Sequence, residues 1–382
     1  MLKRMRSFLV LVMLFIAVTM SAQVTTATMS GKVTAQDEPI IGATVVAVHE
    51  PSGTRYGTVT NVSGQFNLQG MRTGGPYKVE ISYVGYQTAI YKGINLSLGE
   101  NYVLNVSLKE SSELLDEVVV TASKESNMKS DRAGAIMNAN RDMINSTPTI
   151  SRSISDIMRL SPQGADVGNG FAVGGGNYRQ SFVTVDGAAF NNTFGLGGNL
   201  PANGSPISLD ALEQVTVAVT PFDVRQSGFT GGAINAVTRS GDNQFRGTAY
   251  MYFNNENLKG SKVDDYELLR SKAQYYTYGA SFGGPIIKDK LFFFVNGEYE
   301  DNVTAGSSYL PRTALGQSYS SGNVHRPLQS DMDAISNFLI NKYDFNPGKY
   351  NGYSTDTPAY RIMARVDWNA NQDNKVSFRF TR

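Results

Sequence analysis

Residues 291–300, Leu-Phe-Phe-Phe-Val-Asn-Gly-Glu-Tyr-Glu, decide the fold of this chain. Successive side chains of a β-strand point to opposite faces of the sheet. One face of this stretch carries no charge, whereas the other ends in polar groups. The uncharged face has Leu291, Phe293, Val295, Gly297 and Tyr299, and the opposite face has Phe292, Phe294, Asn296, Glu298 and Glu300. The stretch therefore predicts a long amphipathic strand.

Four other stretches share this alternation: residues 245–253, 276–282, 360–368 and 376–380. An apolar face toward lipid and a polar face toward a lumen, over about 9–11 residues, is typical of outer-membrane β-barrel strands. Short connections (283–290, 369–374) alternate with long ones (254–273, 301–358), as periplasmic turns and extracellular loops do. A soluble β-sandwich, the alternative, would not require that alternation. The longest connection contains a helical run at 332–343 and His325, which we expect to be solvated.

The number of these strands predicts that the chain is the N-terminal portion of a larger barrel. Five barrel-type strands can be counted, whereas bacterial outer-membrane barrels have an even number of strands, about 22 where the lumen is plugged. We therefore expect the 382 residues expressed alone not to form a heat-modifiable, membrane-inserted barrel.

Composition excludes several classes of protein. The net charge of +1 argues against a nucleic-acid partner, and the absence of cysteine excludes disulfides, cysteine-based zinc sites and a lipoprotein-type acylated N-terminus. With two histidines and no persuasive pair of carboxylates, the chain is not expected to be an enzyme or to carry a cofactor or metal.

The N-terminus predicts secretion. Residues 1–22 combine a basic start at Lys3, Arg4 and Arg6 with an apolar run of signal-peptide length that ends near small residues. A single anchoring helix is the alternative, although the run at 8–18 is short for a membrane span.

Residues 23–109 predict a small β-sandwich that folds on its own. An apolar run at 43–48 and an alternating run at 77–83 are typical strands, and Gly/Pro/Ser turns separate the runs. His49 follows the first of these runs without a second ligand nearby, so we expect it at the surface.

Residues 110–129 predict a polar linker that contains one strand-forming segment, Leu-Asp-Glu-Val-Val-Val-Thr-Ala at 115–122. Three valines and a threonine favour a strand, and polar flanks leave it nothing to bury against. It suits a segment that another protein pairs with edge to edge, or, alternatively, an ordinary edge strand of the preceding domain.

Residues 130–241 predict an α+β domain rich in glycine. A short helix at 152–160 would bury Ile154, Ile157 and Met158 before Ser161-Pro162 ends it, and strands are expected at 180–186, 212–217 and 231–239. The glycines from 168 to 176 permit close packing of the backbone or close approach of a ligand, and the former is the simpler explanation.

These motifs, in this order, resemble the TonB-dependent outer-membrane transporters of Bacteroidetes type. Residues 42–86 resemble the carboxypeptidase regulatory-like domain, and Asp116, Glu117, Val118, Val119, Val120, Thr121 and Ala122 resemble a TonB box. The chain also resembles the plug signature of the family, at Gly175, Gly176, Asp186, Gly187, Gly231 and Gly232. Val219-Thr220-Pro221-Phe222-Asp223 replaces the frequent Arg-Gly-Pro, as in the Oar-related subgroup. The linker motif ends in Val-Thr-Ala rather than in the Val-Val-Gly-Tyr-Gly usual in glycan transporters, which weakens a glycan-import interpretation without excluding it.

The resemblance implies a fold, a location and a mechanism. A regulatory-like sandwich, a linker (110–129), a plug (130–241) and the start of a barrel (242–382) would place the chain in the outer membrane of a Gram-negative bacterium. TonB, driven by ExbB and ExbD, would pair with the TonB box and move the plug. Candidate substrate contacts at the plug apex are Asn191, Asn192, Phe194, Leu196 and Asn199. The substrate, peptide or another nutrient, and a surface lipoprotein partner stay open, as does a surface adhesin on the same scaffold.

Overall fold

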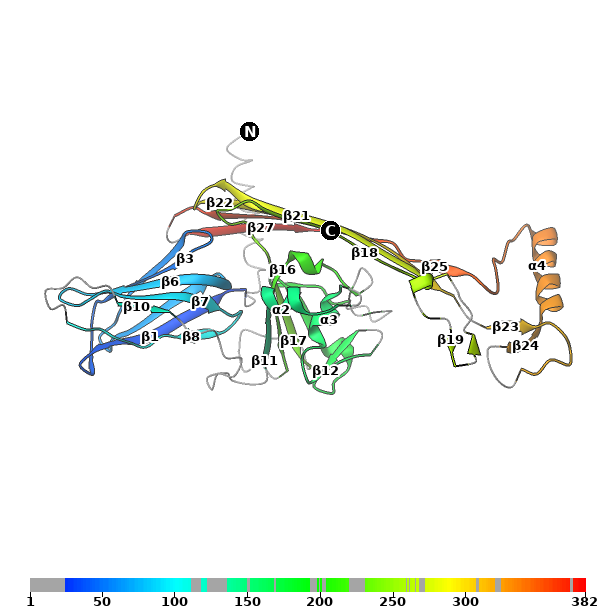
Figure 1. Cartoon of the computed structure of the whole chain (residues 1–382), viewed down its shortest axis with the longest axis horizontal. Coiled ribbons are helices and arrows are strands. Elements are labelled where there is room, and N and C mark those ends of the chain that lie inside the picture. Colours follow the sequence, from blue (N-terminus) through cyan, green and yellow to red (C-terminus); the bar gives the residue numbers. More distant parts are fainter. Residues whose placement is uncertain are drawn as a thin grey trace, which may run out of the picture. The chain divides into compact units, whose positions relative to one another are not determined.

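The structure is a computed structural model of the whole chain (Figure 1). It describes residues 25–110, 118–121, 136–149, 152–167, 170–192, 198, 200, 204–219, 231–258, 260, 262–264, 266–267, 272–306, 309–319, 324–371 and 374–382. The predicted signal at 1–22 lies outside these residues. The chain divides into two compact units, of which the first contains residues 1–246, 282–295 and 363–381.

The N-terminal domain (residues 25–110, together with residues 118–121) is a sandwich of two five-stranded sheets, and the sequence predicts a sandwich. One sheet contains β1 (Ala27–Ala35), β2 (Glu38–Pro39), β5 (Gln65–Met71), β8 (Asn101–Val103) and β9 (Val106–Ser107). The other has the order β10-β7-β6-β3-β4, with β3 (Thr44–His49), β4 (Thr54–Val59), β6 (Gly74–Ser82), β7 (Ala89–Leu96) and β10 (Val118–Thr121). Alternate residues of both sheets, among them Met29, Val45, Phe66 and Ile81, form one core between them.

His49 is buried rather than exposed, so the sequence-based placement at the surface is wrong. Strand β3 extends to His49, and the two-residue period that buries Val45 and Ala47 therefore turns His49 inward as well. Its Nδ1 lies 2.7 Å from the Ser52 hydroxyl, and its ring lies 5.0 Å from the Tyr77 ring. Burial, and then the nearby Arg72 charge, lower the pKa of His49 to about 3.

We predict that His49 stays neutral through mildly acidic pH. Because its folded pKa is below the ordinary value of 6.5, the unfolded chain binds more protons between pH 6.5 and about 3. The histidine therefore lowers the stability of the domain as the pH falls through that range, and it has no effect above it. Residues 23–109 contain one histidine, so its NMR signal can be followed in that domain expressed alone. An imidazole that titrates near pH 6.5 in the folded domain would contradict the burial.

The central domain (residues 136–239) is built on a mixed sheet with the order β11-β16-β17-β14-β15. Its strands are β11 (Ile136–Asn140), β14 (Phe182–Val185), β15 (Ala188–Ala189), β16 (Leu212–Ala218) and β17 (Ala233–Thr238). A two-stranded sheet of β12 (Gly164–Asp166) and β13 (Phe171–Val173), the 3-10 turns η1 (Tyr178–Gln180) and η2 (Leu209–Ala211), and two short helices complete it. Strand β14 runs parallel to β17, so the ends of both strands meet at one edge.

Helix α3 (Ile154–Met158) confirms the predicted helix, which follows α2 (Arg141–Ser146). Ser153 and Asp156 form a capping box: the Ser153 hydroxyl accepts from Ser155 N, and Asp156 accepts from Ser153 N. Ile154, Ile157 and Met158 are fully buried in the core of the central domain.

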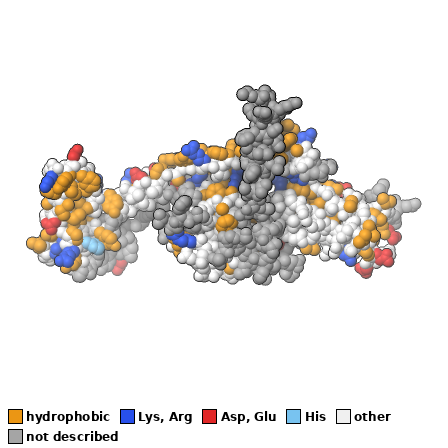
Figure 2. Space-filling view, turned by 180° about the vertical axis from the view of Figure 1, so that it is seen from behind, with side chains coloured by type: hydrophobic (Ala, Val, Ile, Leu, Met, Phe, Trp, Pro, Cys, Tyr) orange, Lys and Arg blue, Asp and Glu red, His pale blue; other side chains and the backbone are white. Residues whose placement is uncertain are grey.

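The five amphipathic stretches form one sheet, with the strand order β18-β21-β22-β26-β27. The strands are β18 (Arg246–Asn255), β21 (Gln274–Ile287), β22 (Leu291–Ala305), β26 (Ala359–Asn369) and β27 (Lys375–Thr381). Along β22 and β26 the burial alternates as predicted, and Figure 2 shows hydrophobic side chains along these long strands. Exposed apolar residues include Phe282, Val295, Tyr299, Tyr360, Ile362, Trp368, Phe378 and Phe380. The alternation is not visible as burial in β18, which is an edge strand exposed on both faces.

Strand β21 is longer than the sequence predicts. Gly283, Gly284 and Pro285 resemble turn residues, yet the strand continues to Ile287 and the turn begins only at residue 288. The glycines leave space for aromatic rings, because a Cβ on Gly284 would lie 2.3 Å from the Phe245 ring. Small side chains at these two positions therefore reflect packing rather than a chain reversal.

The two long connections carry small elements of their own. The first contains η3 (Glu256–Leu258), β19 (Lys262–Val263) and β20 (Tyr266–Glu267), and the second contains β23 (Leu310–Arg312), β24 (Val324–Leu328), α4 (Gln329–Tyr343) and β25 (Ser354–Asp356). His325 is exposed, as expected, and its ring lies 4.1 Å from the Tyr309 ring. Among the described residues, no helix is both long enough and apolar enough to cross a membrane.

Candidate functional site

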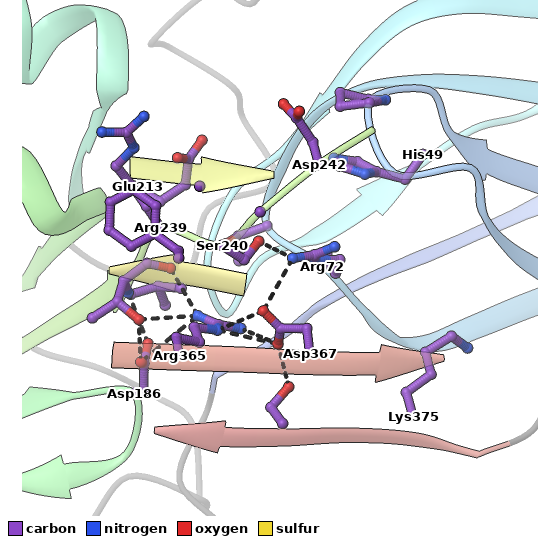
Figure 3. Close-up of a pocket in the computed structure, with 18 of the residues that line it drawn as sticks. His49, Arg72, Asp186, Glu213, Arg239, Ser240, Asp242, Arg365, Asp367 and Lys375 are labelled. Carbon is purple, nitrogen blue, oxygen red and sulfur yellow. Dashed lines mark hydrogen bonds and ion pairs between the residues drawn. The ribbon is translucent and has the colours of Figure 1, made fainter. Parts of the chain in front are cut away.

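A charged cavity of about 510 Å³ lies within the first unit (Figure 3). It is lined by residues of the N-terminal domain, the central domain and the adjoining ends of the long strands. Its charged lining residues are Arg72, Arg141, Asp186, Glu213, Arg239, Asp242, Arg246, Arg365, Asp367, Lys375 and Arg379. These side chains come from positions far apart in the sequence, and basic groups outnumber acidic ones.

Asp186 lies at the centre of an ion-pair network that joins the central domain to the long strands. It follows β14, and the parallel pairing of β14 with β17 brings it to Thr238 at the end of β17. Its carboxylate accepts from Thr238 N at 2.8 Å and from the Thr238 hydroxyl at 2.5 Å. It also pairs with Arg379 of β27 at 2.8 Å and with Arg365 of β26 at 3.7 Å. The aspartate of the predicted plug signature therefore holds the central domain against two long strands.

Arg365 lies between two carboxylates, as Figure 3 shows. Its Nε donates to Asp367 at 2.9 Å, its Nη2 donates to the other carboxylate oxygen at 3.0 Å, and its Nη1 donates to the Thr238 carbonyl at 2.8 Å. Asp367 also accepts from the Ser377 hydroxyl at 2.5 Å. Paired charges of this kind are stable only as a set, because loss of one partner leaves an uncompensated charge away from water.

Glu213 and Arg239 add a second charged group to the same cavity. Arg239 donates to the Asp210 carbonyl at 3.1 Å and lies 4.7 Å above the Phe294 ring. Burial raises the pKa of the Glu213 carboxyl, against the opposing effect of the Arg141 and Arg239 guanidinium groups.

The plug-signature residues have structural roles that the geometry explains. Asp186 and Gly187 have φ values of +45° and +83°, and Gly175 has +76°. Gly232 packs directly on Val173, since a Cβ would lie 2.4 Å from the valine Cγ1. A Cβ on Gly176 would lie 3.2 Å from the Gln180 side-chain oxygen, and a Cβ on Gly231 would lie 3.2 Å from the Gln180 backbone carbonyl. These positions favour the packing explanation over direct ligand contact.

Only part of the predicted substrate-contact loop lies within the described residues. Asn191 accepts from Val183 N and donates to the Ser181 carbonyl, both at 2.7 Å, so its amide extends the hydrogen bonding of β14. Asn192 donates to the Gly198 carbonyl at 3.3 Å. Phe194, Leu196 and Asn199 lie outside the described residues. Substrate contact by these five residues stays a prediction.

The predicted coupling segment forms the last strand of the N-terminal sheet. Val118, Val119, Val120 and Thr121 pair in parallel with residues 89–92 of β7. The edge strand that the alternative interpretation predicts is therefore present, while pairing with another protein stays a prediction. Asp116, Glu117 and Ala122 lie outside the described residues.

The second unit contains a separate buried group of charges. Arg361 of β26 donates to Glu298 at 2.8 Å and to Glu300 at 2.7 Å, and the Tyr250 hydroxyl donates to Glu298 at 2.5 Å. The alternation of the strands predicts that Glu298, Glu300 and Arg361 face the polar side of their strands, and all three are at most 5% exposed. Within the described ranges, no three His, Cys, Asp or Glu side chains gather as metal ligands would.

Comparison with known proteins matches both ends of the described chain to protein families. Residues 28–109 match the carboxypeptidase regulatory-like domain, and residues 237–382 match an outer membrane beta barrel domain. The TonB-dependent transporter Oar of Myxococcus xanthus is 28% identical over 240 residues, which are 60% of this chain and 20% of that protein. The chain is thus similar in sequence to a TonB-dependent transporter.

A second relative extends over more of the chain. The TonB-dependent receptor SusC of Bacteroides thetaiotaomicron is 27% identical over 341 residues, 81% of this chain and 32% of that protein. The chain thus spans about a fifth to a third of the length of these two relatives. Both carry names of transporters or receptors rather than enzymes, in agreement with the sequence prediction. The barrel match places this portion of the chain in the outer membrane.

Solved structures that match part of the chain include a siderophore receptor and an outer membrane transporter. The siderophore receptor PirA from Acinetobacter baumannii is 17% identical, with 65% of this chain and 31% of that chain covered and a TM-score of 0.43. The outer membrane transporter YddB from Escherichia coli is 13% identical, with 65% and 33% covered and a TM-score of 0.45.

Proposed function

We propose that the protein is an active transporter of the outer membrane, in which TonB pairs with residues 115–122 and moves the central domain as a plug. The observation that carries this proposal is the position of β10 at the end of a sheet. An edge strand offers a row of backbone donors and acceptors to which an incoming strand can add. The names of the two relatives, a TonB-dependent transporter and a TonB-dependent receptor, support the same assignment.

The charged cavity supports a plug that is held in place but can be released. The central domain is attached to β26 and β27 through hydrogen bonds and ion pairs of Asp186 and Thr238. Such contacts are directional and exchange with water, so a pulling force can separate them step by step. ExbB and ExbD would drive TonB, and the substrate, a peptide or another nutrient, would bind on the extracellular side. A surface lipoprotein partner is compatible with this arrangement.

Capture by TonB tests the proposal without knowledge of the substrate. The periplasmic domain of TonB, immobilised on a resin, should retain the full-length protein from a detergent extract of outer membranes. A variant with residues 115–122 replaced by Gly and Ser in equal number should pass through, because a flexible chain pairs poorly as a strand. Equal retention of both proteins, or of neither, would reject the proposed coupling. If neither is retained and cells that lack the protein lose surface attachment, the adhesin alternative is favoured.

A further inference from the structure

We propose that the N-terminal domain docks on the turns that join the long strands, and that Arg72 fixes it to the charged network around Asp367. This surface joins two parts of the same chain and adds to the proposed function. It rests on that function only in that these turns are called periplasmic. All the residues involved lie in the first compact unit of the chain.

One part of the interface is the loop from Pro51 to Thr54, which lies against the segment before β18, the turn after β21 and the end of β26. The Pro51 carbonyl accepts from Asn243 N at 2.9 Å, just before β18 begins. The Thr54 hydroxyl accepts from the Asn369 amide at 2.9 Å, and the same amide donates to the Asp289 carbonyl at 3.1 Å. A single loop of the N-terminal domain therefore bonds to the segment before β18 and to the end of β26, and Asn369 connects it to the turn that follows β21.

Gly53 lies directly against the Asp289 side chain, in a backbone conformation that favours glycine. Its φ is +63°, and a Cβ built on it would lie 2.1 Å from the nearer Asp289 carboxylate oxygen. Asn243 holds Asp289 in this position, because its amide donates to the Asp289 carboxylate at 2.7 Å and its carbonyl oxygen accepts from Asp289 N at 2.9 Å. The surface is shaped for glycine on one side and for a fixed turn on the other.

The other part of the interface is centred on Arg72, in the turn between β5 and β6. Its guanidinium donates to the Ser240 hydroxyl and lies 3.6 Å from the Asp367 carboxylate (Figure 3). The Tyr77 hydroxyl donates to the Arg72 carbonyl at 2.8 Å, and Arg72 N donates to the Tyr56 hydroxyl at 3.2 Å. Two buried tyrosines of the N-terminal domain thus hold the backbone that presents this charge.

Two further contacts join the N-terminal domain to β27 and to the central domain. The Lys375 ammonium lies 4.1 Å above the Tyr56 ring, and Leu98 N donates to the Gln214 amide oxygen of the central domain at 3.2 Å. Polar and charged contacts dominate, as they do in interfaces that separate and re-form rather than in permanent ones. The docked domain closes one side of the charged cavity and carries β10, the proposed coupling strand, in the same sheet as β3 and β6.

An engineered disulfide tests the docking directly, because the chain contains no cysteine of its own. A Cβ on Gly53 would lie 3.4 Å from the Asp289 Cβ, close to the separation of about 3.5–4.5 Å in disulfides. In outer membranes from cells producing the full-length protein with Gly53→Cys and Asp289→Cys, we expect an intramolecular disulfide in most molecules after mild oxidation. A non-reducing gel reports it, and thiol reductant should reverse it. A second pair, Pro51→Cys with Asn243→Cys, should behave in the same way and replaces the first pair if Gly53→Cys impairs folding.

Matched controls decide between docking and chance encounter. Val62 lies beyond the opposite end of β4 and is 76% exposed, so Val62→Cys with Asp289→Cys should stay reduced. Adding Arg72→Gln should lower the oxidised fraction at least about twofold, because a charge-assisted contact is lost, whereas exposed Arg55→Gln should leave it unchanged. If both facing pairs stay reduced in protein that reaches the membrane, docking is wrong; if Arg72→Gln has no effect, the assignment of Arg72 is wrong. None of these readouts needs transport, so a failure of the proposed function would be seen separately.

Discussion

Val119→Pro in the full-length protein is expected to abolish energy-dependent uptake while leaving the amount of protein at the cell surface normal. Proline lacks the backbone N–H and fixes φ near −65°, so it interrupts strand pairing at this position. Val119→Thr keeps β-branching and the backbone donor and should transport almost normally. Comparing Val119→Pro with Val119→Thr therefore separates the contribution of the backbone at this position from that of the side chain.

The position of β10 in the N-terminal sheet allows the two edges of this strand to be tested separately. Val119 pairs with Ile90 and Val120 pairs with Tyr91, and successive N–H groups of a strand point to opposite edges. We therefore add a second variant, Val120→Pro. Proline at one of positions 119 and 120 removes the N–H that faces β7, and proline at the other removes the N–H that faces the free edge. If TonB adds to the free edge, one of these prolines should reduce TonB capture more than the other.

Surface abundance and uptake have to be measured in the same cells. If β10 served only to complete the N-terminal domain, proline would lower the stability of that domain and uptake would fall in proportion to protein level. Normal uptake by Val119→Pro at normal abundance would remove coupling through this strand from the proposed function.

The strands were predictable from the sequence because their signal is local. The alternation in residues 291–300 and 360–368 places Glu298, Glu300 and Arg361 on the polar face, and the structure buries all three. The same two-residue period buries His49 once the strand is extended by one residue beyond the apolar run at 43–48. Composition suggests a turn at Gly283 and Gly284, because it does not distinguish a chain reversal from space left for the Phe294 and Phe245 rings.

The charged network was not predictable by the same means. Arg365 and Arg379 lie 179 and 193 residues after Asp186 in the chain, and no local pattern connects them (365 − 186 and 379 − 186). The sequence identified Asp186 only as part of a motif, and Arg72 not at all. Convergence of this kind depends on how the N-terminal domain, the central domain and the long strands pack together, which strand periodicity does not specify.

Asp186→Asn should loosen the central domain from the long strands without unfolding either. Asparagine tolerates the left-handed backbone of residue 186, whose φ is +45°, and it is nearly the same size as aspartate. The change removes the negative charge that Arg365 and Arg379 share, and breaking a buried pair in this way costs about 3–5 kcal/mol. Because the side chains of these three residues are 14–16% exposed, we expect a smaller loss of about 2–3 kcal/mol in the free energy of release.

Protease cleavage of the central domain in isolated outer membranes, measured across a urea series, reports this release. Asp186→Asn should shift cleavage to lower urea, whereas Asp242→Asn should shift it little. Asp242 pairs at 3.3 Å with Arg246, whose side chain is 59% exposed, and such surface pairs contribute less than about 1 kcal/mol. Adding Arg379→Gln to Asp186→Asn should recover part of the loss, because the arginine no longer lies unpaired beside the asparagine. Equal shifts for Asp186→Asn and Asp242→Asn would mean that the central domain is held by its apolar contacts, such as Phe294 and Met363, and not by the ion pairs of Asp186.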